Sequence, residues 1–441
     1  MPATRRRRTV GVVRALLVLC TGTLYLSTAA AQLRLDITRG VENAVPIAVV
    51  PFGGEATGTP TDVSAIIAAD LQRSGRFAPL PRAQMVDQPQ PGDPIRFADW
   101  RLLKTDYLVV GRVENQGTDT AVQYELHNVV TGQRLLGESR SAPSKSLRMT
   151  AHRAADRIFE QLTGIRGAFA TRIAYVAVDG RPPSQRYRLM VADADGYGAV
   201  RIAESSEPLM SPAWSPDGRM LAYVSFEGKA SAIYVQQVSS GERRRVSARA
   251  GINGAPAWSP DGHKLALTLS RDGNLDIYTL DLGGQTLTRV TSDEAIDTEP
   301  VWALDGRSLY FTSDRSGGPQ LYQVALDEAR HAERLTFEGS YNARPRLSPD
   351  GTQLGLVTLD HGAYRIGTFD LKSRTLRVLS TSQQDESPSF APNGAALIYG
   401  TKQGGRGALA IVSADGRYQQ QLSSDSGDVR EPAWSPFMTP P

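Results

Sequence analysis

Few residues of this sequence have the types and spacing that catalysis or metal binding requires. The single cysteine, Cys20, excludes a disulfide framework and a cysteine-based zinc site. Signatures of serine hydrolases, phosphate-binding loops, dinucleotide-binding folds and zinc proteases are missing from the sequence. The five histidines lie apart, without the spacing of metal ligands: His127, His152, His263, His331 and His361. The residues therefore predict no catalytic machinery, no resident metal and no cofactor, and we interpret each histidine as a surface residue.

Two short charged segments are interpreted as structural. Asp193 and Asp195 precede Gly196, but the further acidic ligands of a calcium loop are missing, so the segment predicts a turn. The basic run Arg243–Arg245 falls on an expected outer strand. Charges on such a strand discourage edge-to-edge aggregation, so we interpret the run as a solvated edge rather than a nucleic-acid contact.

The main organising feature is an internal repeat built around the string Pro-Ala-Trp-Ser-Pro-Asp-Gly. Successive copies start 44, 44, 45, 43 and 44 residues apart. Within each copy, Ser-Pro-Asp-Gly predicts a tight turn, because Pro fixes φ and Gly accepts a positive φ. The copies are 211–218, 255–262, 299–306, 344–351, 387–394 and the shortened 431–436.

Each repeat predicts four short strands, which is the content of one β-propeller blade. Ahead of the first copy lie strand-like segments near 173–178, 187–192 and 199–203, without a first strand. The last copy supplies only a first strand, so the two ends together predict one composite blade and six blades in all. Closing the ring removes exposed sheet edges, which favours a propeller over the alternative of an open solenoid.

The first 31 residues have the pattern of a secretory signal. A basic stretch, Arg5–Arg8, precedes an apolar run, and Ala29–Ala31 supplies small residues for cleavage between Ala31 and Gln32. A membrane anchor is the alternative, and Leu19 before Cys20 argues against a lipid attachment site. The paired arginines leave twin-arginine export open beside the general route.

Removing this segment changes the charge of the protein. The whole chain has 49 basic and 46 acidic residues, a net charge of +3 and a sequence pI near 8.9. The first 31 residues hold five arginines and no acidic residue, so the mature chain has 44 basic and 46 acidic residues, or −2. The balance argues against nucleic acid as a partner.

The rest of the mature chain divides into a tail, a domain and the propeller. Residues 32–43 form a tail, 44–165 a mixed α+β domain, and 170–441 the all-β six-bladed β-propeller of WD40-like repeats. In the tail, apolar and polar residues alternate, which predicts a strand. The strand either lies at the edge of its own domain or adds to a partner's sheet.

Loops that join the fourth strand of one blade to the first strand of the next all emerge at one end of the central channel. We call this opening the propeller mouth. Its loops are acid-rich, with Arg344 and Arg430 interspersed, and predict either a partner-steering rim or merely solvated loops. The acidic residues are Glu207, Asp293, Glu294, Asp297, Glu299, Asp385, Glu386, Asp425, Asp428 and Glu431.

Together with the repeats, several further segments give the chain a resemblance to the TolB family, the periplasmic propeller proteins of the bacterial Tol–Pal system. The resemblance covers essentially the whole chain. The segments that carry it are Pro46–Phe52, Ala69–Leu71, Ser74–Gly75, Leu162–Phe169, Thr171–Val176, Asp195–Tyr197, Pro208–Gly218, Asn253–Pro256 and Thr298–Pro300.

The resemblance implies a monomeric, non-enzymatic periplasmic protein that supports outer-membrane integrity and constriction at division. It implies a Pal-type outer-membrane lipoprotein at the propeller mouth and a TolA-type inner-membrane protein at the tail. The mouth residues would be Glu207, Met210, Asn253, Thr298, Glu299, Asn342, Arg344, Asp385, Glu386, Arg430 and Glu431. The tail residues would be Gln32, Leu33, Arg34, Leu35, Asp36, Ile37 and Thr38.

Two departures from the family pattern affect individual contacts. Ile252 stands where many relatives have a histidine, and Arg346–Leu347 replaces a small residue and tryptophan. Two other functions remain as alternatives. One is the propeller module of a peptidase, which would need a further domain with a catalytic serine, and the other is a solute-binding or lectin-like propeller.

Overall fold

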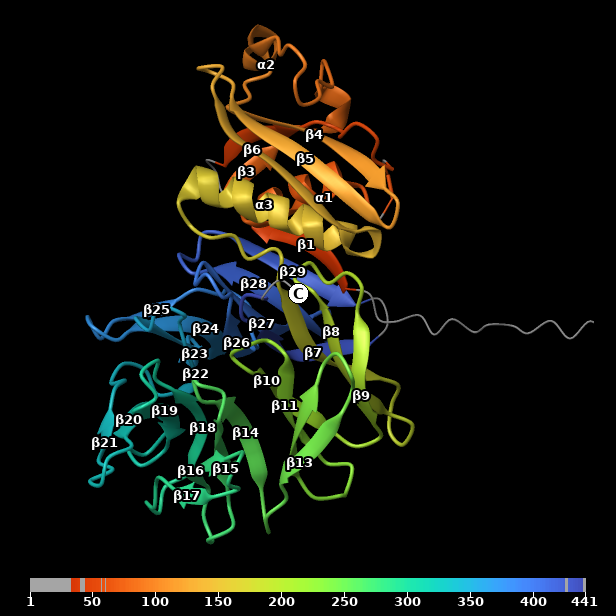
Figure 1. Ribbon diagram of the computed structural model, residues 1–441. Helices are drawn as coiled ribbons and strands as arrows, with labels where there is room; N and C mark the ends of the chain where they lie inside the picture. Colours follow the sequence, from red (N-terminus) through yellow and green to blue (C-terminus); the bar gives the residue numbers. More distant parts are fainter. Residues whose placement is uncertain (1–32, 40–43, 57, 60, 425–426, 439–441) are drawn as a thin grey trace, which may run out of the picture.

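The computed structural model describes residues 33–39, 44–56, 58–59, 61–424 and 427–438. The expected signal segment, its cleavage site and Gln32 lie outside these residues. The chain forms an α/β domain packed against a six-bladed propeller, as Figure 1 shows. This confirms the predicted fold class. None of the described helices combines the length and apolar character needed to cross a membrane.

The α/β domain is built on a five-stranded sheet in the order β3-β2-β4-β5-β6. Its strands are β2 (Val45–Val49), β3 (Phe77–Pro79), β4 (Tyr107–Gln116), β5 (Asp119–Asn128) and β6 (Arg134–Pro143). Its helices are α1 (Val63–Arg73), α2 (Phe97–Leu102) and α3 (Leu147–Thr163), with 3₁₀ turns η1 (Arg82–Gln84) and η2 (Ser144–Ser146). The apolar faces of α1 and α3 pack on one side of the sheet, and Trp100 of α2 packs on the other.

The propeller consists of six sheets, and each blade is named here by its place in the chain. Blade 1 is β10 (Leu209–Trp214), β11 (Met220–Ser225), β12 (Ala232–Gln237) and β13 (Arg243–Ser247). Blade 2 is β14 (Asn253–Trp258), β15 (Lys264–Leu269), β16 (Asp276–Asp281) and β17 (Leu287–Arg289). Blade 3 is β18 (Asp297–Trp302), β19 (Ser308–Ser313), β20 (Gln320–Ala325) and β21 (Ala332–Arg334).

The remaining blades include both ends of the propeller. Blade 4 is β22 (Asn342–Leu347), β23 (Gln353–Asp360), β24 (Ala363–Asp370) and β25 (Leu376–Val378). Blade 5 is β26 (Glu386–Phe390), β27 (Ala396–Gln403), β28 (Arg406–Ser413) and β29 (Gln419–Ser424). Blade 6 combines β30 (Asp428–Trp434) with β7 (Arg172–Asp179), β8 (Arg186–Asp193) and β9 (Val200–Ser205).

The repeated string explains how each blade turns and how it attaches to its neighbour. In blade 1, Asp217 accepts from the Ser215 hydroxyl at 2.5 Å and from the Arg219 N–H at 3.0 Å, which closes the turn. In blades 1 to 3, the tryptophan that precedes the turn donates its indole N–H across the blade boundary. Trp258 donates to the Ala213 carbonyl at 3.1 Å, and the same bond recurs at Trp214 and Trp302.

The tail strand β1 (Leu33–Arg39) lies on the propeller, not on its own domain. It pairs antiparallel with β29, from Leu33 opposite Ser424 to Arg39 opposite Gln419, and becomes the fifth strand of blade 5. Figure 1 shows it between the two domains. The expectation of an edge strand in the α/β domain was therefore wrong, because alternation predicts a strand but does not choose its sheet.

The linker between the domains is held against α3. Asp156 accepts the N–H groups of Phe169 at 2.7 Å and Ala170 at 3.2 Å. At Gly167, an added Cβ would lie 2.4 Å from the Cα of Asp156, so only glycine fits. Burial raises the pKa of the Asp156 carboxyl to about 7, against the effect of these two N–H donors.

Candidate functional site

The six inner strands β10, β14, β18, β22, β26 and β30 surround the central channel, each in contact with the next and β30 with β10. Each strand carries one left-handed residue directly before a proline, next to a break in strand register. These residues, with their φ angles, are Ser211 (51°), Ala255 (46°), Glu299 (55°), Arg344 (59°), Ser387 (53°) and Glu431 (52°). Residues before proline normally avoid this conformation, so the channel holds a ring of strained positions.

Charged side chains from this ring meet one another between blades. The Arg344 Nε lies 2.9 Å from Glu299 Oε1 of blade 3, and its Nη1 donates to the Ser387 hydroxyl of blade 5. On the other side of the ring, the Ser211 N–H donates to Glu431 at 2.6 Å. The side chains at equivalent repeat positions therefore form a polar lining that no single blade could build.

Burial in the channel shapes the protonation of these groups. Burial raises the pKa of Glu431, although Arg344 and the Ser211 N–H oppose the shift. Burial would lower the pKa of Arg344, but the charges of Glu299, Glu431 and Glu386 outweigh it and raise that pKa. Burial lowers the pKa of the nearby Arg346. The lining thus holds charges of both signs close together, where each stabilises the other.

The propeller mouth faces away from the α/β domain. The Asn393 side chain, in the turn between the first two strands of blade 5, donates to the Arg166 carbonyl of the linker at 2.9 Å. Because strands in a blade alternate in direction, that turn lies at the end of the blade opposite the loops of the mouth. The mouth is consequently left uncovered by the other described parts of the chain.

The predicted mouth residues divide into two groups in the structure. Exposed or partly exposed side chains belong to Glu207, Met210, Thr298, Glu299, Arg344, Glu386 and Arg430. Buried side chains belong to Asn253, Asn342, Asp385 and Glu431. Glu431 still lines the channel, as described above.

The other three buried residues hydrogen-bond to their own loop or to a neighbouring strand of their blade, whereas the sequence predicted side chains facing a partner. Asn253 accepts from the Ser247 hydroxyl at 2.7 Å. Asn342 donates to the Glu338 carbonyl at 2.7 Å. Asp385 accepts from the Thr401 hydroxyl at 2.6 Å. At these three positions the polar side chain satisfies buried hydrogen-bonding groups of the propeller.

Sequence reasoning emphasised acidic residues and missed an apolar component of the mouth. Ile252 and Ile296 are 50% and 44% exposed in the loops before β14 and β18, and Phe337 is 66% exposed before β22. Tyr364 packs edge-on against Tyr341 at 5.1 Å. Exposed apolar side chains beside charged ones are typical of protein-binding surfaces. The sequence signal that could have identified these apolar residues is their position in loops of the mouth.

Two histidines differ from the expectation of surface residues. His263, His331 and His361 are exposed, but His127 and His152 are buried. His152 lies beside Asp193 and Asp195, which the sequence separates by about 40 residues. Spacing along the chain could not reveal this group, because its members come from two domains.

An α/β domain followed by a six-bladed propeller, with a composite closing blade and a tail strand on blade 5, defines a two-domain propeller protein. Family models match both parts: the TolB amino-terminal domain over residues 33–135 and the TolB beta propeller domain over residues 159–438. The chain belongs to the TolB family.

Relatives agree along nearly the whole length. The chain is 57% identical over 423 residues to the Tol-Pal system protein TolB of Xanthomonas campestris pv. campestris strain B100, covering 94% of this chain and 96% of that protein. It is 56% identical, with the same coverage, to that of Xanthomonas oryzae pv. oryzae strain MAFF 311018. The crystal structure of TolB from Acinetobacter baumannii matches with a TM-score of 0.86 at 40% identity, over 92% of this chain and 100% of that one.

Proposed function

We propose that this chain is the periplasmic, non-enzymatic binding component of a Tol–Pal system. In this proposal the propeller mouth binds a Pal-type outer-membrane lipoprotein and the tail binds a TolA-type inner-membrane protein. The complex supports outer-membrane integrity and invagination during division. The observation that carries the proposal is the ring of six strained residues, three of them charged, in a mouth that the described α/β domain leaves uncovered.

The mouth suits a protein partner for two reasons. Its exposed apolar side chains, such as Phe337 and Ile252, offer area that a partner can bury. The Glu299–Arg344 pair beneath them offers charges at fixed positions, which confer specificity and orientation on a docking protein.

The test for the mouth is capture of the lipoprotein by the mature chain carrying Glu299→Arg. Arg344 occupies the equivalent position of the next blade at nearly the same φ, so arginine fits this backbone. The matched control is Glu333→Arg, which makes the same charge change on the outer strand β21 of the same blade. We expect lipoprotein capture to be lost in the first variant and kept in the second. Equal capture by both variants would refute the site.

The test for the tail is deletion of residues 32–38, which should abolish capture of the inner-membrane partner and leave lipoprotein capture intact. We further propose that the two sites are coupled through the α/β domain. The affinity for the TolA-type partner is then measured with and without saturating lipoprotein. Equal affinities would exclude the coupling while leaving both binding sites standing.

A further inference from the structure

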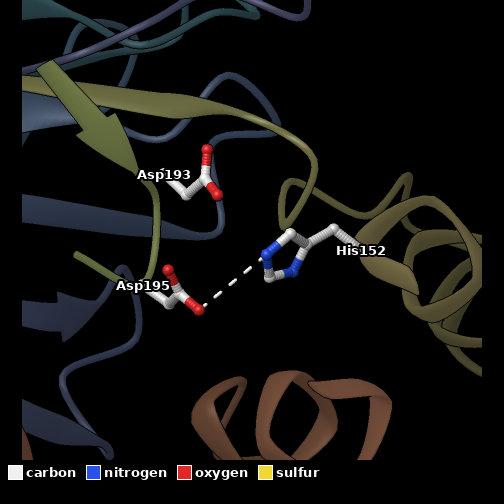
Figure 2. A group of neighbouring side chains, drawn as sticks. All are labelled: His152, Asp193 and Asp195. Atoms are coloured by element: carbon white, nitrogen blue, oxygen red, sulfur yellow. Dashed lines mark ion pairs between the residues drawn. The ribbon is translucent and has the colours of Figure 1, made fainter. Parts of the chain in front are cut away.

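A polar cluster joins the α/β domain to the propeller at the turn between β8 and β9. It contains three carboxylates, two guanidinium groups and one imidazole. The members are Asp70 and Arg73 of α1, Arg148 and His152 of α3, and Asp193 and Asp195 of the turn. Figure 2 shows His152 directed from its helix toward the two turn aspartates. No function described above uses this cluster.

The imidazole of His152 is held in one orientation. It is fully buried, and its Nδ1 lies 2.6 Å from Asp70 Oδ2. Nδ1 faces Asp70, which leaves Nε2 as the ring nitrogen directed at the turn. That Nε2 has no hydrogen-bond partner among the described residues and lies 3.8 Å from Asp195 Oδ2. A fully buried ring nitrogen without a hydrogen-bond partner among the described residues therefore faces a carboxylate of the propeller turn.

The surroundings of this nitrogen match those of metal-binding histidines. Such a histidine commonly donates its other ring N–H to a carboxylate, as His152 does to Asp70. One ligand atom from each of His152, Asp193 and Asp195 lies within 4.8 Å of the others. A mixed nitrogen and carboxylate set suits zinc better than calcium or magnesium, which prefer oxygen alone. We propose that these three residues form a Zn²⁺ site that links α3 to the propeller.

Two guanidinium groups compete for this site. The Arg148 Nε lies 3.6 Å from Asp193 Oδ2 and its Nη2 pairs with Asp195 Oδ2, while the Arg73 Nη1 lies 3.8 Å from Asp195 Oδ2. Zinc binding therefore requires the closer guanidinium, that of Arg148, to release both carboxylates. The same guanidinium lies over the Tyr197 ring, 4.0 Å from its centre, and this contact can be kept after release. The competition predicts that removing Arg148 increases the affinity for zinc.

Zinc at this turn would act on the tail strand as well as on the domains. Gly196, with φ +86°, lies against Leu33, because an added Cβ would be 2.5 Å from the Leu33 Cβ. A metal bound by Asp193 and Asp195 therefore fixes the surface on which the first described residue of the tail packs. The turn is reachable from solvent, since both aspartates are partly exposed and Ala194 borders an interdomain cavity of about 1130 Å³.

The test measures Zn²⁺ binding to the metal-free mature chain by isothermal titration calorimetry. We expect one zinc per chain, and loss of that binding in His152→Ala. Asp70→Asn should weaken it by roughly 10- to 100-fold, the usual effect of removing a partner behind a ligand. The matched control is His361→Ala, which removes an exposed histidine beside Asp360 and should leave zinc binding unchanged.

A second variant keeps the test decisive if His152→Ala does not fold. Arg148→Met removes the closer competing cation and should bind zinc more tightly than the unaltered chain, with thermal unfolding raised further by added zinc. Zinc binding unaffected by either change, or lost equally in the His361→Ala control, would overturn the proposal. No zinc binding in any variant would also overturn it.

Discussion

The packing of the tail strand on the propeller gives a prediction that can be worked out from the structure. Leu33 is 6% exposed and belongs to the apolar cluster between blades 5 and 6, with Leu422 and Met190. Replacing a buried leucine by alanine costs about 2 to 3 kcal/mol where the site lies at the end of an element. Since about 1.4 kcal/mol is a tenfold change, Leu33→Ala should raise the undocked fraction of β1 by about 30- to 150-fold.

Amide hydrogen exchange measures this change directly. The N–H groups of β29 that face β1 should exchange faster in Leu33→Ala by about the same factor, while inner strands of blade 5 keep their protection. The matched control is Leu102→Ala, because Leu102 is 82% exposed in α2 and contacts neither strand. Unchanged exchange in β29 would refute the expected contribution of Leu33 to the docking of β1. Equal acceleration by both variants would show a general loss of stability.

Three further predictions concern stability. The raised pKa of Asp156 means that its contribution to the free energy of unfolding is complete below the ordinary aspartate pKa. This contribution amounts to about 4 kcal/mol and is lost as pH rises to 7. Urea unfolding of Asp156→Asn should lack this loss, and an unchanged pH slope would contradict it. Trp258→Phe removes the bond to the Ala213 carbonyl and should lower the free energy of unfolding by about 1 to 3 kcal/mol in the same assay. Arg344→Met should cost about 2 kcal/mol by leaving Glu299 without its ion pair, and adding Glu299→Gln should recover part of it in a double-mutant cycle.

The repeat could be predicted from the sequence because its signals are local. The Ser-Pro-Asp-Gly turn closes through bonds within a few residues, as at Ser215 and Asp217. Its copies therefore mark the boundary between the first two strands of each blade, and the number of copies together with the partial units at the two ends predicts six blades. The partial repeats at the two ends can be completed in few ways. The sheet β30-β7-β8-β9 is the arrangement that leaves no inner strand unpaired.

The functional groups were harder to predict because they depend on distant parts of the chain. Alternation showed that the tail is a strand, but only the folded propeller offers the β29 edge with which it pairs. Loop position predicted Asn253 as a contact, yet its side chain turns inward to satisfy the loop backbone. His152 acquires its neighbours from α1 and from the propeller, so its environment exists only after both domains have docked.

The strained ring at the mouth links the fold to the proposed function. The propeller needs a left-handed residue before each proline at six equivalent positions, and glycine would adopt that conformation at the lowest cost. None of the six is glycine. Each side chain there costs about 1 to 2 kcal/mol of strain, and the sum is comparable to the whole stability of a typical domain. The strain therefore indicates that these positions hold residues other than glycine because of the contacts that their side chains make. At Glu299 and Arg344, the contacts within the chain account for one ion pair, while Glu299 Oε2 has no hydrogen-bond partner among the described residues.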